Sequence, residues 1–192
     1  METTNTEKIS LPWYKVWLDA LFRPSVAGYE TFLQDVHATP KRAYIWLIIS
    51  GLINGVITAF VQPPQRRSII IVVGAPLHAL AAVLFFIGIA GLIQLLAQVL
   101  GGTGTYSKLV YTLATFNAPT TIISSLLLLI PYGLWINAAF GVYGAILSMI
   151  AVKVVHQLEW RKAIVATLPV ISLAILVIAV TPWLIKFTTS LR

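Results

Sequence analysis

The sequence has no cysteine and only 6 acidic residues among its 192 positions. The lack of cysteine excludes disulfide bonds, thiolate catalysis and cysteine-ligated metals. No aspartate or glutamate lies within the long apolar stretches, so the carboxylate relay common in proton-coupled carriers is missing. The HExxH and GxSxG motifs and a pair of intramembrane aspartates are missing as well. We therefore expect no enzyme, no cofactor and no metal site.

Apolar residues dominate what is present. The composition is 58% hydrophobic and only 10% charged, which is typical of a membrane protein. The net charge of +7 would suggest nucleic acid as the partner of a soluble protein. Here the basic residues lie between apolar stretches, where they favour anionic headgroups. We expect membrane lipids as partners and no nucleic acid.

The apolar stretches predict an all-α polytopic membrane helix bundle with about five transmembrane helices. The first stretch has about 19 residues, which at about 1.5 Å each covers about 28 Å of a hydrocarbon core near 30 Å. The second is too long for one untilted span, and Gly74-Ala-Pro76 suggests a break after an interfacial or tilted lead-in. Pro131-Tyr-Gly133 predicts a tight turn. The expected spans are residues 43–61, 76–100, 109–130, 134–155 and 163–185.

Residues 1–42 are expected to form a cytoplasmic N-terminal segment with amphipathic helices, and residues 43–192 the transmembrane domain. One helical face of this segment gathers Trp13, Tyr14, Trp17, Leu18, Leu21 and Phe22. The helix is too short to span, so it either lies in the headgroup region or packs on the protein's own bundle. A weaker helical pattern follows Pro24, with Glu30, Gln34 and Asp35 on its polar side, and ends at Thr39-Pro40.

Basic residues predict the orientation. With a cytoplasmic N-terminus, nine of the lysines and arginines lie on the cytoplasmic side and four lie outside. The positive-inside rule therefore favours a cytoplasmic N-terminus, and an odd number of spans places the C-terminus outside.

The most specific local motif is Gly101-Gly102-Thr-Gly104-Thr-Tyr106-Ser-Lys108, followed by Tyr111, Asn117 and Pro119 in the third expected span. Together with Leu-Phe-Arg-Pro24 and five spans, it resembles the Yip1 domain family over nearly the whole chain. The resemblance implies the fold. Eukaryotic members bear an Asp-Leu-Tyr-Gly-Pro type motif and are associated with prenylated Rab GTPases. That motif is missing here, so Rab binding is not carried over, and the chain is similar to the compact bacterial members. We accordingly expect the plasma membrane of a bacterium.

The glycine-rich motif has two interpretations. Its three glycines permit a sharp reversal between two spans, and the plain turn is favoured. Alternatively, its backbone N–H groups hold an anion such as a lipid phosphate beside Lys108. Pro119 similarly predicts either an ordinary kink or a broken helix of the kind that binds substrates in transporters, with Asn117 and Thr120 able to satisfy the freed backbone groups.

Few polar side chains lie within the expected spans, and each is a candidate for helix packing or function. They are Asn54, His78, Gln94, Gln98, Asn117 and Asn137. Gly51 and Gly55 form a GxxxG pattern that favours packing within the chain over dimerisation.

The leading hypothesis is a non-enzymatic Yip1-like protein whose N-terminal segment and basic loops engage the membrane surface, a protein partner or a second copy of the chain. The alternative is a small permease or channel component, in which Pro119, Asn117, Asn54 and His78 converge on one polar path. The two hypotheses differ in whether these residues share a cavity.

Overall fold

The computed structural model describes residues 9–172 and residue 176, and its named elements within that part are all helical. The expected all-α class is confirmed. In chain order the elements are α1 (Trp13–Phe22), α2 (Val26–Leu33), α3 (Pro40–Val61), the 3₁₀ turn η1 (Pro64–Arg66), α4 (Arg67–Ile69), the π-helical turn η2 (Ile70–Gly74), α5 (Ala75–Val99), α6 (Tyr106–Leu127) and α7 (Gly133–His156). A further helix begins at Trp160 and continues through residue 172.

Hydroxyl caps begin two of these helices. The Ser25 Oγ accepts a hydrogen bond from the Gly28 N–H at 3.0 Å at the start of α2, and the Thr39 Oγ1 accepts one from the Arg42 N–H at 3.3 Å at the start of α3. Pro40 is the first residue of α3, where its missing N–H costs nothing. The cap and the proline therefore start the first long helix at Pro40.

The break expected at Gly74-Ala-Pro76 is wrong. The helical path is continuous from Pro64 to Val99, over 36 residues, and η2 precedes α5 in place of an interruption. A π-helical turn is wider than an α-helical turn, and such a bulge accommodates a proline that can neither donate to the preceding turn nor fit closely against it. At about 1.5 Å per residue this path is about 54 Å long, well beyond a hydrocarbon core of about 30 Å.

Within the described residues, three helical stretches are long and apolar enough to cross a membrane: Pro40–Val61, Pro64–Val99 and Trp135–His156. The predicted count of five spans is not confirmed. The predicted third span corresponds to α6, which is less apolar and is surrounded by protein, with every residue from Leu109 to Phe116 buried. The predicted fifth span, residues 163–185, lies outside the described residues beyond residue 172 except for residue 176.

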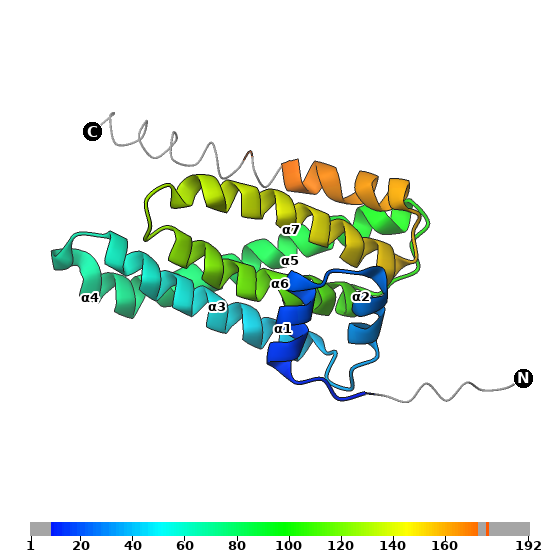
Figure 1. The fold of residues 1–192 in the computed structure, drawn as a ribbon, viewed down its shortest axis with the longest axis horizontal. Helices are drawn as coiled ribbons and strands as arrows, with labels where there is room; N and C mark the ends of the chain where they lie inside the picture. The colour runs from blue at the N-terminus through cyan, green and yellow to red at the C-terminus, as the bar shows by residue number, and fades with distance from the viewer. Residues whose placement is uncertain (1–8, 173–175, 177–192) are drawn as a thin grey trace, which may run out of the picture.

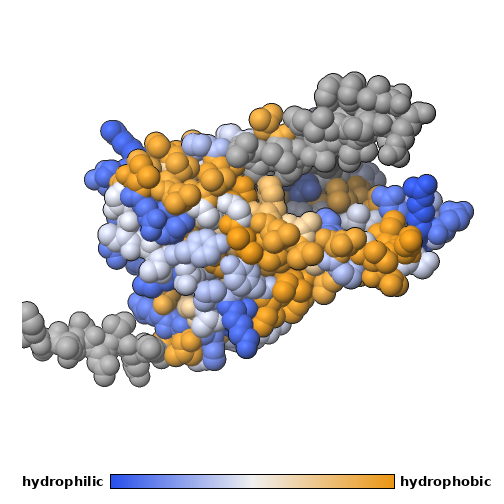
Figure 2. Space-filling model, turned by 180° about the vertical axis from the view of Figure 1, so that it is seen from behind, coloured by the Kyte–Doolittle hydropathy of each residue, from blue (hydrophilic) through white to orange (hydrophobic). Residues whose placement is uncertain are grey.

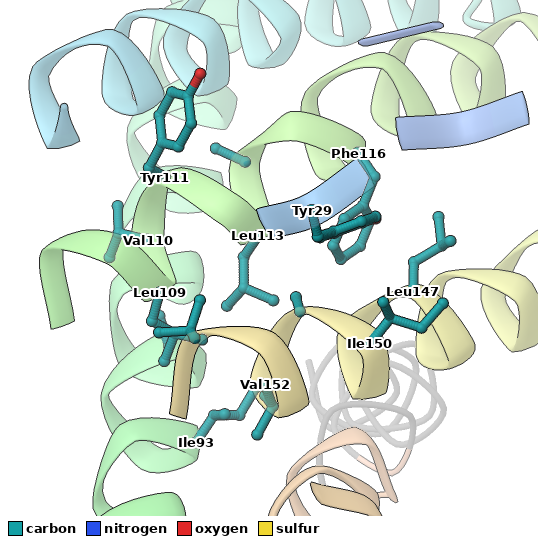
Figure 3. Close-up of a cluster of buried hydrophobic side chains, with 14 of the residues drawn as sticks. Tyr29, Ile93, Leu109, Val110, Tyr111, Leu113, Phe116, Leu147, Ile150 and Val152 are labelled. Atoms are coloured by element: carbon teal, nitrogen blue, oxygen red, sulfur yellow. The ribbon is translucent and has the colours of Figure 1, made fainter. Parts of the chain in front are cut away.

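The long helices run roughly along one direction, and α1 crosses that direction beside the start of α3 (Figure 1). A buried apolar core lies where α1 and α2 cover α6 and α7, and it includes residues of α3 and α5. Figure 3 shows Tyr29 of α2 beside Phe116 of α6, with Leu147 and Ile150 of α7 near them.

The surface of the molecule is divided into polar and apolar parts. Apolar residues form a broad area over the middle of the molecule, between a largely polar end and a polar tip (Figure 2). Exposed apolar side chains continue along α3 and α5, among them Leu52, Phe60, Leu77 and Leu84. This apolar surface is the part suited to contact lipid tails.

Gly51 and Gly55 allow α3 and α5 to approach closely. A Cβ on Gly51 would lie 2.9 Å from the Ala79 Cα, and one on Gly55 would lie 2.6 Å from the Ala75 Cα. The expected role of this GxxxG pattern in packing within the chain is therefore confirmed.

Candidate functional site

A buried carboxylate holds the N-terminal segment against the long helices. Asp35 follows α2, and its side chain is fully buried. Its Oδ1 accepts hydrogen bonds from the His37 N–H at 3.0 Å and the Leu11 N–H at 3.3 Å. Its Oδ2 accepts one from the Arg42 Nη1 at 2.6 Å and one from the Tyr111 hydroxyl at 3.1 Å. We call Leu11, Asp35, Arg42 and Tyr111 the Asp35 cluster.

Arg42 completes the connection. Its Nη2 donates to the Leu11 carbonyl at 3.0 Å, so a single guanidinium binds both the Asp35 carboxylate and the segment before α1. Nearby, the Val36 N–H donates to the Ile9 carbonyl at 2.9 Å. These contacts join residues that are far apart in the sequence and fix the chain entering α1 to the start of α3 and to α6.

Aromatic rings extend the cluster to α1. The Arg42 guanidinium lies 4.8 Å from the centre of the Trp46 ring. The Trp46 ring is 5.7 Å from the Tyr111 ring and 5.8 Å from the Trp17 ring. Trp13 lies 5.0 Å beyond Trp17. The series therefore connects α1, α3 and α6 through edge and tilted ring contacts, which are favourable aromatic geometries.

The charge state of Asp35 follows from its surroundings. Burial by itself raises the pKa of this carboxyl, but the N–H groups of His37 and Leu11, the Arg42 charge and the Tyr111 hydroxyl together hold the pKa below its ordinary value. Asp35 is consequently ionised at neutral pH, and the cluster contains a true ion pair with Arg42.

Helix α1 presents an apolar face away from the bundle. It packs inward through Val16, Ala20 and Leu21, which are buried. Four large side chains remain exposed: Trp13 at 52%, Tyr14 at 54%, Leu18 at 53% and Phe22 at 70%. The prediction that Leu21 shares one apolar face with these four residues was wrong. Leu21 instead joins the smaller residues Val16 and Ala20 on the face that packs against the bundle. Both expected roles are thus compatible with the helix, which packs on the bundle and still exposes aromatic rings.

The glycine-rich turn packs tightly against the end of α7. A Cβ on Gly104 would lie 2.3 Å from the Val155 carbonyl oxygen, and one on Gly102 would lie 2.8 Å from the His156 Cβ. Gly101 has φ +92°, a conformation that favours glycine. The N–H groups of Gly101, Gly102 and Thr103 all donate to protein carbonyls. This arrangement favours the plain turn over an anion site. Lys108 is exposed and makes no ion pair within the described residues.

A comparison with known families matches the Yip1 domain over residues 18–181. The chain belongs to the Yip1 domain family. The match begins within α1 and covers every described helix after it, and with the long apolar helices it makes this chain a membrane protein. Comparisons with curated proteins and with solved structures found no match.

The residues that the family resemblance singled out lie at several separate points of the fold. The Tyr106 hydroxyl donates to the Ile87 carbonyl at 3.3 Å, which ties α6 to α5. Pro24 lies between α1 and α2. Tyr111 alone among these residues reaches the Asp35 cluster.

The polar residues of the expected spans are not brought together. Asn54 accepts from Thr58 on its own helix at 3.4 Å, and Asn117 donates to the Leu113 carbonyl on its own helix at 2.9 Å. His78 is exposed on α5. Gln94 is buried and donates to the Gly104 carbonyl at 3.0 Å. The remaining two are Gln98, which is exposed, and Asn137, which is half-buried.

Pro119 lies inside α6 without ending it. The proline leaves the Thr115 carbonyl without its usual donor, and neighbouring side chains bond other carbonyls of the same helix. Thr120 donates to the Phe116 carbonyl at 2.6 Å, and Asn117 donates one turn earlier, to Leu113. These side chains thus bond backbone carbonyls within two residues of the Thr115 carbonyl, while the helix remains continuous.

The sequence analysis did not identify the centre of this candidate site. It placed Asp35 on the polar side of a weak helix, whereas the carboxylate is buried. It counted Arg42 only among the basic residues that predict the orientation. The signal was an acidic residue seven positions before an arginine at the start of an apolar helix, with Pro40 between them. The contact between Asp35 and Tyr111, which lies 76 positions later in the sequence, could not be predicted from a local pattern.

Proposed function

We propose that this Yip1 domain is a non-enzymatic membrane protein that acts by inserting the exposed aromatic face of α1 among lipid headgroups. The observation that carries the proposal is the arrangement of α1 itself. Trp13, Tyr14, Leu18 and Phe22 are exposed on a helix that crosses the direction of the long helices (Figure 1). A helix in that orientation lies close to the plane of a bilayer that the long helices cross.

The chemistry of the exposed face supports lipid as the occupant. Tryptophan and tyrosine favour the membrane interface because each joins a large apolar ring to a polar N–H or O–H group. Lys15 and Arg23 are exposed on or beside the same helix and suit anionic headgroups. The Asp35 cluster supports the proposal further, because it fixes the chain that leads into α1 and so lowers the entropy lost when the helix engages the surface.

The permease alternative has less support. A transport path requires polar groups that face a shared cavity. Asn54 and Asn117 instead bond within their own helices, and His78 is exposed. These three residues therefore act separately in the part of the chain that the structure describes.

We further propose a cytoplasmic N-terminus, an external C-terminus, five spans and the plasma membrane of a bacterium. The distribution of lysine and arginine supports the orientation. In this arrangement the glycine-rich turn and the segment after α7 lie on the cytoplasmic side, and the α3–α4 turn with Arg66 and Arg67 lies outside.

Site-directed labelling tests the role of α1, because a chain without cysteine accepts a single label at any chosen position. Leu18→Cys and Phe22→Cys each carry a nitroxide on the exposed apolar face of α1, and Glu30→Cys carries one at an exposed acidic position of α2. In nanodiscs we expect the labels at positions 18 and 22 to be accessible to oxygen and shielded from a water-soluble nickel complex. The control at position 30 should show the reverse.

Equal nickel accessibility at all three positions would contradict insertion of α1 into lipid. If the labels at positions 18 and 22 instead became immobile only in a particular protein complex or in a dimer of this chain, a protein surface would replace lipid as the occupant of this face.

A further inference from the structure

A second surface feature lies beside the Asp35 cluster, at the start of α3. It is a pocket of about 390 Å³ that is widely open at the surface, called the cavity below. The residues that line it come from the turn after α2 and the first turns of α3: Val36, His37, Thr39, Lys41, Arg42 and Ile45. The cavity lies where the basic flank of the first long helix meets its apolar part.

The mouth of the cavity carries the positive charge of Lys41. Lys41 is exposed, and no carboxylate lines the cavity. Arg42 contributes little free charge because Asp35 is paired with it at 2.6 Å. Lys41 is not ion-paired within the described part of the chain, so its ammonium group is available to an anion. The Thr39 hydroxyl accepts from the Arg42 N–H and keeps its own O–H as a donor.

An apolar surface continues from the cavity along α3. Val36 is 46% exposed and Ile45 is 45% exposed at its edge. Ile48, Ile49 and Leu52 follow on α3, and all three are exposed. Their spacings of three, four and seven residues from Ile45 place them on one side of the helix. A cationic mouth followed by an apolar surface matches a molecule with an anionic head and hydrocarbon tails.

We propose that this cavity binds one anionic phospholipid, with the phosphate at Lys41 and Thr39 and an acyl chain along Ile45, Ile49 and Leu52. The inference rests on the proposed function in placing the N-terminal segment at the headgroups, and it adds the lipid class and a discrete site. The Asp35 cluster forms one wall through Arg42, so a lipid bound here contacts the same side chain that fixes the segment before α1.

Native mass spectrometry of the full chain, titrated in detergent with dioleoylphosphatidylglycerol or dioleoylphosphatidylcholine, tests the site. We expect one phosphatidylglycerol to be retained in preference to phosphatidylcholine. Lys41→Gln should weaken retention of phosphatidylglycerol about fivefold, the effect expected for one lysine near an anionic surface. Lys162→Gln is the matched control, because it removes the same charge at another exposed position, and it should leave retention unchanged. Ile45→Trp should occupy part of the cavity and weaken retention without altering any charge.

Equal retention by the Lys41→Gln and Lys162→Gln variants would overturn the proposal, as would equal binding of the two lipids by the unmodified chain. The nitroxide at position 22 distinguishes this failure from failure of the proposed function. If that label remains in lipid in the Lys41→Gln variant while retention is unchanged, the cavity is not the site and α1 still inserts. If the label is in water and retention nevertheless depends on Lys41, the lipid site stands and the insertion of α1 is excluded.

Discussion

Asp35 is the single residue on which the position of the N-terminal segment depends most. Its carboxylate receives four hydrogen bonds, from two backbone N–H groups, Arg42 and Tyr111. Removing one partner of a buried ion pair costs more than the pair contributes, because the remaining charge has lost its compensation. Side-chain substitutions here should therefore act on the docking of the segment and leave insertion of the long helices unchanged.

We expect Asp35→Asn to weaken this docking by about 2–3 kcal/mol, less than the range of about 3–5 kcal/mol for fully buried pairs because Arg42 is partly exposed. Hydrogen exchange of the peptide covering residues 9–23 measures the effect, which corresponds to exchange faster by about thirtyfold or more. Asp19→Asn is the control, because Asp19 makes no side-chain ion pair in the described structure. Similar exchange in both variants would show that the ion pair does not hold the segment.

The same carboxylate predicts a pH dependence. Burial alone raises its pKa, but its hydrogen-bond donors and Arg42 hold the pKa of docked Asp35 below the ordinary value of 3.8. A lowered pKa stabilises docking above the ordinary value, and that contribution is lost as the pH falls toward the lowered pKa, because only the undocked carboxyl takes up a proton in this range. Docking should thus be constant from neutral pH down to about pH 5 and should weaken below about pH 4. The difference in exchange between the unmodified chain and Asp35→Asn should shrink over the acidic range; a constant difference would refute the ion-pair explanation.

Gly104 supports a prediction of its own. An added Cβ would lie 2.3 Å from the Val155 carbonyl oxygen, and neither backbone can move without disturbing the turn. We expect Gly104→Ala to lower the free energy of unfolding by about 2–3 kcal/mol. Gly88→Ala is the control, since nothing lies within 4 Å of its added Cβ, and replacing this helical glycine should be neutral or stabilising by up to about 1 kcal/mol. Thermal unfolding in one detergent compares the two, and equal midpoints would contradict the steric argument.

At the scale of helices, hydropathy and turn residues predicted most of the elements. The stretch around Leu109 was recognised as helical, and Pro131-Tyr-Gly133 was recognised as the turn before α7. Local pattern failed where a distant contact decided the outcome. The inward face of α1 is made by Val16 and Ala20, whose burial depends on α6 and not on their hydropathy. The burial of α6 was not predicted, because it depends on contacts with α1 and α3, which lie far from α6 in the sequence.

Continuity of the second long helix likewise depended on a feature that composition does not reveal. Gly74 and Pro76 are helix breakers in most settings, and the sequence analysis read them as an interruption. The π-helical turn η2 lets the helix continue past them. Tyr111 is the one residue of the Asp35 cluster that the sequence analysis singled out. The burial of Asp35 was not predicted, because it requires α2, α3 and α6 to meet.

The contact between α3 and α5 can be tested at Gly55. Because a Cβ there would lie 2.6 Å from the Ala75 Cα, the branched side chain in Gly55→Val should force the two helices apart. We expect a loss of about 2–3 kcal/mol in the free energy of unfolding. Gly88→Val on α5 is the control with open space around it. If Gly55→Val were as stable as Gly88→Val but changed the oligomeric state, the pattern would serve association between chains instead.

The whole molecule is longer than a bilayer is thick. The helical path from Pro64 to Val99 alone covers about 54 Å, whereas a hydrocarbon core is about 30 Å thick. Tilt accounts for only part of the difference, because membrane helices seldom tilt by more than about 40°. The remainder must lie outside the hydrocarbon core. The well-packed end that contains α1, α2 and the Asp35 cluster fits this requirement, since much of its surface is polar (Figure 2).

The proposed orientation places that end in the cytoplasm. Three single-cysteine variants report on it in intact cells: Ser68→Cys beside the α3–α4 turn, Lys108→Cys at the start of α6 and Arg192→Cys at the C-terminus. We expect a membrane-impermeant maleimide to label positions 68 and 192 from outside and to reach position 108 only after the cells are lysed, because basic loops stay on the cytoplasmic side. Labelling of 108 and 68 from the same side would contradict a crossing by the second long helix. Labelling of 192 only after lysis would mean an even number of spans, and the C-terminus would then share the side of the Asp35 cluster.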